Sequence, residues 1–353
     1  MSDREQKGLR GPVKTCVEET TYPDVTAPDA TPVPERKSSY ATEYDAAGRV
    51  LSVGYGNPDG SEWVSRYSYG ASGQLLKIIS GNEGEPSRET VYSYDDRGRP
   101  LEIIDGYTPG NPVIFRYDER GRKTKMQISR PEDYRPNTAA AGSPFQVSDV
   151  PPNLPGGGTA TTVYDEHDRP TEVQVRNARG ELVSRTTRIY DTQGRVAGEK
   201  TILDSPEMLF PNELRAQILE ASGISREELS EELNKQLTAV MGGHEGPSSI
   251  AYSYDNQGRV NQTRHRIFNE AGIVETTYNE QGDIATKITR SERADSETEP
   301  DTPAPTMFPF SEVRHSYRYD EYGNWIEKIT SHRFSPNGTF ESSSIRRRTL
   351  TYY

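Results

Sequence analysis

Short runs in which apolar and polar residues alternate recur along the chain. Residues 113–117, VIFRY, and residues 250–254, IAYSY, place an apolar or aromatic side chain at every second position. Similar alternation follows the turns, for example at Leu76 and Ile78. A period of two over a short run predicts a strand with one face more buried than the other. The pattern therefore predicts many short strands joined by turns. It does not predict the register, which decides which face is more exposed to solvent.

The turns between these runs share one hexapeptide, Tyr-Asp-x-x-Gly-Arg. Its full copies begin at Tyr44, Tyr94, Tyr117, Tyr190 and Tyr254, and weaker copies begin at Tyr69, Tyr164, Tyr278 and Tyr319. An Asp followed three residues later by Gly suits a type I turn that runs into a left-handed residue. The Asp carboxylate accepts hydrogen bonds from turn amides, and Gly takes the positive φ of a three-residue hairpin with a G1 bulge. We therefore interpret the hexapeptide as a hairpin turn, since a catalytic site is normally needed only once.

The residues predicted to form these turns are pairs of Asp and Gly. They are Asp45 and Gly48, Asp95 and Gly98, Asp118 and Gly121, Asp191 and Gly194, Asp255 and Gly258, and Asp320 and Gly323. In this geometry Asp118 faces Arg122 across the hairpin as an ion pair, which contributes under ~1 kcal/mol when exposed. The same aspartates do not have the alternating spacing of a Ca²⁺ loop, so turn capping is the preferred interpretation.

The repeats predict a mainly β fold: an antiparallel meander of β-hairpin repeats, open or partly rolled, with a small inserted helical hairpin. The expected segments are an N-terminal strand and Pro-rich loop (1–39), repeats (40–128), a Pro/Gly-rich loop (129–160), repeats (161–204), a helical insertion (205–243), repeats (244–290), an acidic Pro-rich disordered linker (291–312) and C-terminal repeats (313–353).

The helical insertion has clear start and stop signals. Asn212 begins a first helix and Gly223 ends it, and Ser225 with Glu228 forms a capping box for a second helix. Leucines at helical spacing then line one face of the second helix. The insertion either packs on the sheet or covers an edge, or it serves as a lid that docks a partner.

The tandem Tyr-Asp-x-x-Gly-Arg followed by an alternating strand resembles the YD repeat of the RHS (rearrangement hot spot) family, which also occurs in teneurins. The closing YDEYGNWIEKIT, residues 319–330, resembles the Y-D-x-x-G-N-W variant of bacterial members. The resemblance covers roughly residues 40–128, 160–203, 247–290 and 313–353.

This resemblance implies a β-repeat scaffold. In large family members the repeats form a hollow shell around a C-terminal toxin, whereas small members are secreted or envelope-associated, with carbohydrate binding proposed. This chain has too few repeats for a large shell, lacks a D-P-x-G-type self-cleavage signature, and its last repeat reaches TLTYY at the C-terminus. We therefore expect a small bacterial YD-repeat protein without a toxin module.

Composition narrows the class of protein further. Hydrophobic residues make up only 31% of the sequence, yet there are 21 Tyr. This combination favours a thin β-structure, partly exposed to solvent, over disorder. The net charge of -12 argues against a nucleic-acid partner. No run approaches the ~20 apolar residues of a membrane span. The polar start is not a signal peptide, which leaves a cytoplasmic protein or a removed leader as alternatives. The location therefore stays unpredicted, and a secreted or envelope location is favoured by the resemblance alone.

Motifs for chemistry are missing from the sequence. The five histidines form no zinc motif, and P-loop, dinucleotide-binding and serine-nucleophile signatures are lacking. Cys16 is the single cysteine, and we interpret it as a buried structural thiol in an opening strand. The sequence therefore predicts no enzyme, no cofactor and no metal.

The candidate binding residues are aromatic. They are Tyr69, Tyr94, Tyr117, Tyr254, Tyr319 and Trp325, drawn from a wider set that includes Tyr252 and Tyr317. Exposed aromatic rows stack against sugar rings or apolar protein surface, but the same rings also form the core of a polar repeat. The favoured function is a noncatalytic scaffold or binding module for carbohydrate or a protein at the cell surface. The alternatives are a shield or partner of a separately encoded toxin and, third, a glycoside hydrolase-like enzyme; the oligomeric state stays unpredicted.

Overall fold

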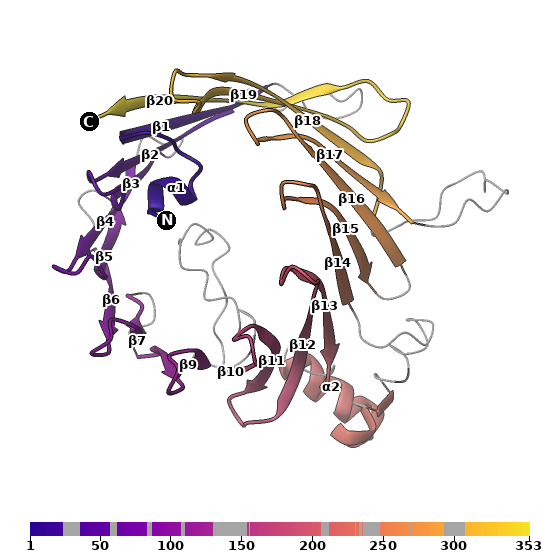
Figure 1. The fold of residues 1–353 in the computed structure, drawn as a ribbon. Helices are drawn as coiled ribbons and strands as arrows, with labels where there is room; N and C mark the ends of the chain where they lie inside the picture. Colours follow the sequence, from indigo (N-terminus) through magenta and orange to yellow (C-terminus); the bar gives the residue numbers. More distant parts are fainter. Residues whose placement is uncertain are drawn as a thin grey trace. The chain divides into compact units, whose positions relative to one another are not determined.

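The computed structural model of the chain describes residues 1–23, 36–56, 62–82, 87–106, 110–129, 154, 156–205, 212–229, 231–232, 235, 248–267, 270–292 and 308–353. These residues form mostly β-strands, with few short helices (Figure 1). The strands follow one another as antiparallel hairpins, so the expected fold class is confirmed. The chain divides into two compact units, which we describe separately.

Unit 1 comprises Met1–Tyr92, Glu275–Thr289 and Pro309–Tyr353. Its strands are β1 (Val13–Tyr22), β2 (Arg36–Tyr44), β3 (Val50–Gly56), β4 (Glu62–Tyr69), β5 (Leu75–Asn82), β18 (Ser311–Tyr319), β19 (Trp325–Arg333) and β20 (Glu341–Tyr352). Most of β6 (Arg88–Tyr94) and β17 (Ile284–Ser291) also belong to it. Within unit 1 the pairing runs β17-β18-β19-β20-β1-β2-β3-β4-β5-β6. The first strand thus lies between β2 and the last strand, a pairing that the repeat pattern did not predict.

Unit 2 comprises Ser93–Val274 and Arg290–Phe308. Its strands are β7 (Pro100–Ile104), β8 (Val113–Tyr117), β9 (Lys123–Ser129), β10 (Gly157–Tyr164), β11 (Pro170–Asn177), β12 (Leu182–Tyr190), β13 (Val196–Leu203), β14 (Ser248–Tyr254) and β15 (Val260–Ile267), and β16 (Glu270–Tyr278) starts in it. From β7 to β15 each strand pairs with the next strand along the chain. This is the meander that tandem hairpins produce.

A bulge after the repeat turn that begins at Tyr69 sets which face of the following strand is buried. Tyr69 pairs with Leu75, but Ser68 pairs with Lys77, so the register shifts by one residue. Leu75 and Ile78 are therefore buried, whereas Leu76 is 39% exposed. The predicted alternation through Leu76 and Ile78 is wrong at Leu76, because a bulge places two residues of one strand opposite one residue of its partner.

The buried cluster of unit 1 gathers residues from its first three strands and the segment before them. It contains Leu9, Val13, Cys16, Tyr44, Val50 and Val53, with Tyr40, Tyr55, Tyr67, Leu350 and Tyr352 packed against it. Cys16 is buried in β1, as predicted, and burial raises the pKa of its thiol to about 11. A thiol with a raised pKa is a poor nucleophile, which agrees with a structural role.

A short helix, α1 (Asp3–Gln6), lies against β1–β3 in unit 1 (Figure 1). The Asp3 carboxylate accepts a hydrogen bond from the Val50 amide (2.9 Å), and the Arg4 amide donates to the Gly48 carbonyl (3.0 Å). We did not predict α1, although Ser2 and Glu5 form a capping box that marks its start.

The helical insertion in unit 2 begins as predicted. Helix α2 (Asn212–Ser222) ends at Gly223, and Ser225 and Glu228 exchange the hydrogen bonds of a capping box. Arg226 in the second helical segment pairs with Glu181 in the turn between β11 and β12, at 2.9 Å. This contact docks the insertion on the hairpin, as in the packing interpretation. No helix among the described residues is long and apolar enough to cross a membrane.

Several strands extend beyond the expected segment boundaries. β2 begins inside the expected N-terminal loop, β10 begins inside the expected 129–160 loop, and β18 begins inside the expected 291–312 linker. The larger parts of these three irregular segments (24–35, 130–153 and 293–307) lie outside the described residues, so the loops and the linker predicted there stay predictions.

Candidate functional site

The repeat turn at residues 117–122 closes through both its backbone and its side chains. The Gly121 amide donates to the Asp118 carbonyl (2.9 Å), and the Asp118 amide donates to the Arg122 carbonyl (3.1 Å). Gly121 has a φ of +86°, a conformation that a residue without Cβ adopts without strain. Asp118 Oδ1 accepts from the Arg122 amide (2.8 Å), and Oδ2 accepts from Arg122 Nε (2.6 Å).

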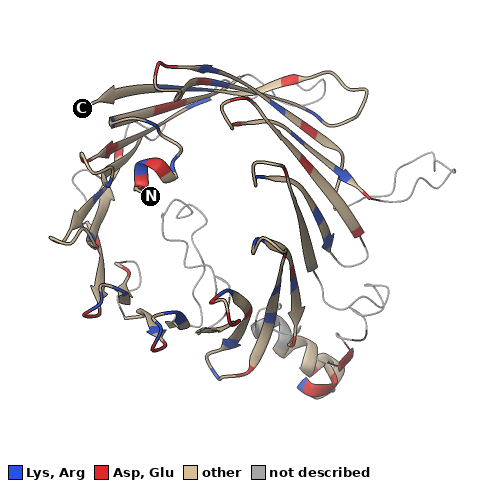
Figure 2. Cartoon of the chain, in the orientation of Figure 1, with Lys and Arg blue, Asp and Glu red and all other residues tan. Residues whose placement is uncertain are grey.

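The same carboxylate–guanidinium contact recurs in other copies of the turn. The paired atoms lie 2.5–2.7 Å apart in Asp45–Arg49, Asp95–Arg99, Asp165–Arg169, Asp191–Arg195 and Asp255–Arg259. The hydrogen bond from the Arg99 side chain lowers the pKa of Asp95, and the Arg99 amide lowers it further. Acidic and basic residues accordingly lie next to each other at several hairpin ends of unit 2 (Figure 2).

The arginine of one copy also packs on the tyrosine of the next copy. The Arg122 guanidinium carbon lies 4.8 Å from the centroid of the Tyr164 ring, and the Tyr164 hydroxyl donates to the Lys123 carbonyl (2.7 Å). Equivalent contacts join Arg49 with Tyr69, Arg99 with Tyr117, Arg169 with Tyr190, and Arg195 with Tyr254. Each such cation–π contact stabilises the fold by about 0.5–2 kcal/mol, depending on its exposure. The motif is therefore an interlocking element that ties each hairpin to the next.

The six predicted binding residues take different places in this arrangement. Tyr69, Tyr117 and Tyr254 are half buried, each under the arginine of the preceding copy. Tyr319 lies opposite Trp325 across β18 and β19, and its hydroxyl donates to Asp283 Oδ2 (2.7 Å). Tyr94 is half buried in β6. Of the six, Tyr319 and Trp325 form a direct cross-strand pair.

An open hollow of about 340 Å³ in unit 2 brings three tyrosines together, and we call it the tyrosine hollow. It is lined by Pro170, Arg188, Tyr190, Val196, Glu199, Tyr252, Tyr254 and Val260. The hydroxyl groups of Tyr190 and Tyr254 donate to the carbonyls of Pro170 and Val196, both at 2.6 Å. Because these hydroxyls are bound to the backbone, the two rings are held in fixed orientations.

An ion pair gives the tyrosine hollow its polar wall. Arg188 lies directly opposite Glu199 on β12 and β13, and Arg188 Nε donates to Glu199 Oε1 (2.6 Å). The Tyr252 hydroxyl donates to Glu199 Oε2 (3.0 Å). Burial, followed by the hydrogen bond to Glu199, raises the pKa of Tyr252 to about 12, so its hydroxyl stays protonated at neutral pH. The side chains of Arg188 and Glu199 remain 30% and 25% exposed, which leaves atoms of both open to a ligand.

Sequence reasoning found the aromatic part of the hollow and missed the polar part. Tyr254 was a candidate binding residue, and Tyr190 was recognised as the start of a repeat. Arg188 and Glu199 were not singled out. The available signal was alternation, because Arg188 stands two residues before Tyr190 and shares its face of the strand.

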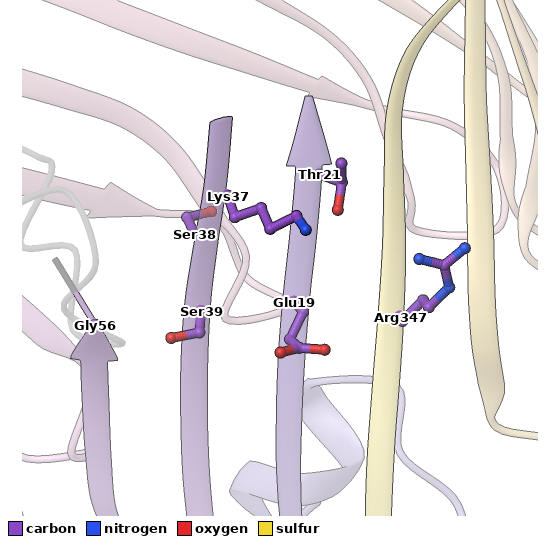
Figure 3. Close-up of a pocket in the computed structure, with 7 residues that line it drawn as sticks. All are labelled: Glu19, Thr21, Lys37, Ser38, Ser39, Gly56 and Arg347. Atoms are coloured by element: carbon purple, nitrogen blue, oxygen red, sulfur yellow. The ribbon is translucent and has the colours of Figure 1, made fainter. Parts of the chain in front are cut away.

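A second hollow, also of about 340 Å³, lies in unit 1 and is strongly polar (Figure 3). Its lining residues are Glu19, Thr21, Lys37, Ser38, Ser39, Gly56 and Arg347. Figure 3 shows Lys37 and Thr21 on neighbouring strands and Arg347 on the other side of β1. Arg347 Nε also donates to Glu327 (2.9 Å), so this guanidinium has a partner in the sheet. Among the described residues that line this hollow, none is aromatic and none is a predicted binding residue.

Within the described ranges, no group of three or more His, Cys, Asp or Glu side chains is arranged to hold a metal ion. His315 has a pKa lowered to about 4, mainly by burial and then by the charges of Lys328 and Arg346. It is therefore neutral at physiological pH, with its ring nitrogen 3.1 Å from the Thr330 hydroxyl.

Comparison with known sequences and structures yielded only distant similarity. No protein-family model and no curated protein matches the chain. A structure of the TcdB2-TccC3-Cdc42 complex is similar over 89% of this chain and 14% of the compared chain, at 13% identity and a TM-score of 0.43.

Two further solved structures show weaker similarity. A porin-like protein from Bacteroides uniformis ATCC 8492 matches over 97% of this chain and 98% of its own, at 12% identity and a TM-score of 0.33. A Tc holotoxin pore from Photorhabdus luminescens matches over 88% of this chain and 16% of its own, at 13% identity and a TM-score of 0.30. This chain thus spans about one seventh of the length of the Tc toxin chains to which it is similar.

Proposed function

We propose that this protein is a noncatalytic YD-repeat scaffold that binds carbohydrate through the tyrosine hollow. The observation that carries the proposal is the meeting of Tyr190, Tyr252 and Tyr254 with the Arg188–Glu199 ion pair in one open hollow. Sugar rings present apolar C–H faces that pack on aromatic rings, and their hydroxyls pair with charged groups. The hollow supplies both kinds of surface at once.

The size of the hollow agrees with a small ligand. Its volume of about 340 Å³ lies at the lower end of the ~300–1,000 Å³ typical of small-molecule sites. The repeated turns hold Tyr190 and Tyr254 through Arg169 and Arg195, at 4.6 and 4.2 Å from the ring centroids. A site built on strands and fixed by such contacts loses little entropy when a ligand binds.

The charged groups of the hollow favour binding over catalysis. Glycoside hydrolysis needs two carboxyl groups about 5–9.5 Å apart on either side of the scissile bond. Among its lining residues, Glu199 is the single carboxylate, and it already accepts from Arg188 and Tyr252. An acceptor held by two donors is suited to orienting a hydroxyl and unsuited to donating a proton.

The resemblance to small YD-repeat proteins supports a setting in which glycans are available, at the cell surface or in the envelope. A glycan array with the full chain identifies a ligand, and isothermal titration calorimetry then measures its affinity. We expect Tyr252→Ala and Arg188→Gln each to weaken binding by about tenfold or more.

Arg185→Gln is the matched control, because Arg185 is on β12 but pairs with Asp204 (2.7 Å) outside the hollow. We expect this variant to bind the ligand as the unmodified chain does. The proposal fails if no glycan binds, or if folded Tyr252→Ala and Arg188→Gln variants retain full affinity. Tight retention of a protein by a chain that binds no glycan would move the function to a protein-partner scaffold.

A further inference from the structure

One face of unit 1 carries a row of cations on neighbouring strands. Lys328 lies directly opposite Arg346 across β19 and β20. Arg348 stands two residues beyond Arg346 and therefore projects from the same face of β20. Like charges that are directly opposite each other in an antiparallel pair destabilise a sheet. A chain with a net charge of -12 thus places two cations where they repel each other.

The carboxylates described near Lys328, Arg346 and Arg348 do not neutralise the positive charge of these three side chains. Glu18 on β1 accepts from Arg348 Nε at 3.0 Å and lies 3.5 Å from Arg346 Nη1. Lys328 forms no ion pair with any residue in the described part of the chain, and its ammonium instead lies 5.6 Å from the centroid of the Tyr317 ring. Two arginines therefore share one carboxylate while the lysine beside them has none.

The electrostatic surroundings of Lys328 show the same imbalance. Burial, and then the charge of Arg346, lowers the pKa of Lys328, and the charges of Asp283 and Glu18 only partly offset this effect. Asp283 already accepts from the Tyr319 hydroxyl at 2.7 Å, and Glu18 accepts from Arg348 Nε at 3.0 Å. The desolvation cost of the partly buried Lys328 ammonium is therefore only partly compensated.

The row is open to a ligand as well as positive. The Arg346 side chain is 43% exposed, whereas that of Arg348 is 12% exposed and packs on Trp325, with its guanidinium carbon 3.5 Å from the ring centroid. Trp325 and Glu18 thus hold Arg348 in place, and Arg346 keeps donors for an incoming group. A guanidinium presents paired donors that match the two oxygens of a carboxylate or sulfate.

We propose that Lys328, Arg346 and Arg348 form a binding site for one oxyanion, a carboxylate or sulfate group. The bound group neutralises the opposed pair of Lys328 and Arg346 and gives the ammonium of Lys328 its missing partner. An acidic saccharide and a free inorganic anion share this chemistry, and the experiment below separates the two sources. The site lies in unit 1 and does not depend on the tyrosine hollow.

Calorimetric titration of the full chain with sodium sulfate and with a galacturonate trisaccharide tests the proposal, with sodium chloride holding the ionic strength constant. We expect saturable binding of at least one of them and no binding of a neutral galactose trisaccharide at this site. Tighter binding of the galacturonate than of sulfate assigns the source to an acidic saccharide, and the reverse order assigns it to a free anion.

Lys328→Gln and Arg346→Gln are the test variants, and Lys287→Gln on β17 is the control with the same charge change in the same unit. We expect the two test variants to bind the anion about tenfold more weakly or worse, and the control to bind it normally. Without anion, Lys328→Gln is expected to change the melting temperature little, because the repulsion from Arg346 that it removes offsets the lost contact with the Tyr317 ring. Equal losses in Lys328→Gln and Lys287→Gln, or no saturable binding by the unmodified chain, would overturn the proposal.

Discussion

The turns at residues 118–122 and 320–324 have the same closure but different connections. In both, the Gly amide donates to the Asp carbonyl, at 2.9 Å for Gly121 and 3.1 Å for Gly323. In both, the Asp carboxylate accepts from the amide of the fifth residue, at 2.8 Å for Arg122 and for Asn324. The Asp and Gly of the motif thus suffice to make the turn.

The fifth residue decides to what the turn is joined. Arg122 is partly exposed and reaches the ring of Tyr164 in the next copy. Asn324 is 1% exposed; its Oδ1 accepts from the Arg10 amide (2.6 Å) and its Nδ2 donates to the Arg10 carbonyl (2.9 Å). Arginine links neighbouring hairpins, whereas the shorter asparagine fixes the segment before β1. One substitution in the repeat therefore converts a local link into a contact between residues more than 300 apart.

The largest expected effect comes from breaking the asparagine contact. Asn324→Ala removes the two hydrogen bonds that this buried side chain forms with the amide and carbonyl of Arg10, and is expected to lower stability by about 2–3 kcal/mol. The two tryptophans, Trp63 and Trp325, both belong to unit 1, so tryptophan fluorescence during urea unfolding follows this unit.

Asn324→Arg tests the same comparison, because it introduces the arginine that the full copies of the motif have at this position. It should destabilise unit 1 as strongly as the alanine variant, because no space exists for a guanidinium at a side chain that is 1% exposed. A stable Asn324→Arg variant would show that the motif residue, and not the buried site, governs this turn.

A smaller effect is expected at the arginine turn. Arg122→Gln removes the contacts with Asp118, Asp168 and the ring of Tyr164, and should cost about 1–2 kcal/mol. A double-mutant cycle with Asp118→Asn, measured by calorimetry, isolates the ion pair and should give a coupling of about 0.5–1 kcal/mol. Strict additivity of the two variants would mean that the pair contributes nothing.

Two substitutions at the glycine position of the turn are expected to change stability in opposite directions. Gly121→Ala forces an L-residue to a φ of +86° and should lower stability by about 1–2 kcal/mol. Asp168 occupies the corresponding place in its copy with a φ of +61° and forms ion pairs with Arg120 and Arg122. In an Arg120→Gln, Arg122→Gln background, which lacks both ion pairs, Asp168→Gly should raise stability by up to about 1 kcal/mol. Thermal unfolding of both variants checks this, and changes in the same direction would refute the assignment of strain.

The smallest expected effect is an acid dependence of the turns. Burial alone raises the pKa of Asp118, but hydrogen bonds from the amide and side chain of Arg122 outweigh it, and the pKa is lowered. Because the folded pKa lies below the unfolded value of about 3.9, the contribution is complete above that value and is lost as the pH falls through the folded pKa. Asp118→Asn should therefore flatten the decrease in melting temperature below about pH 4. An unchanged acid profile would show that Asp118 does not titrate with unfolding.

The local structure of this protein follows from neighbouring residues in its amino-acid sequence. Asp118 and Gly121 select a three-residue hairpin by hydrogen bonding and backbone conformation, and these depend only on neighbouring residues. Alternating residues then predict the strands, and the capping box at Ser225 and Glu228 predicts the start of the second helical segment. The capping box of Ser2 and Glu5 is a local signal of the same kind. It marks the start of α1, although we did not predict this helix.

The connections between these local elements depend on contacts that form only in the folded sheet. The bulge that exposes Leu76 and buries Leu75 depends on pairing across the hairpin, and the contacts of Asn324 depend on where Arg10 lies. Strand register also places Arg188 and Tyr252 in one hollow. It likewise places Lys328 directly opposite Arg346. Local propensities are set by adjacent residues, whereas a site is a sum of contacts among strands, and those contacts exist only once the sheet has formed.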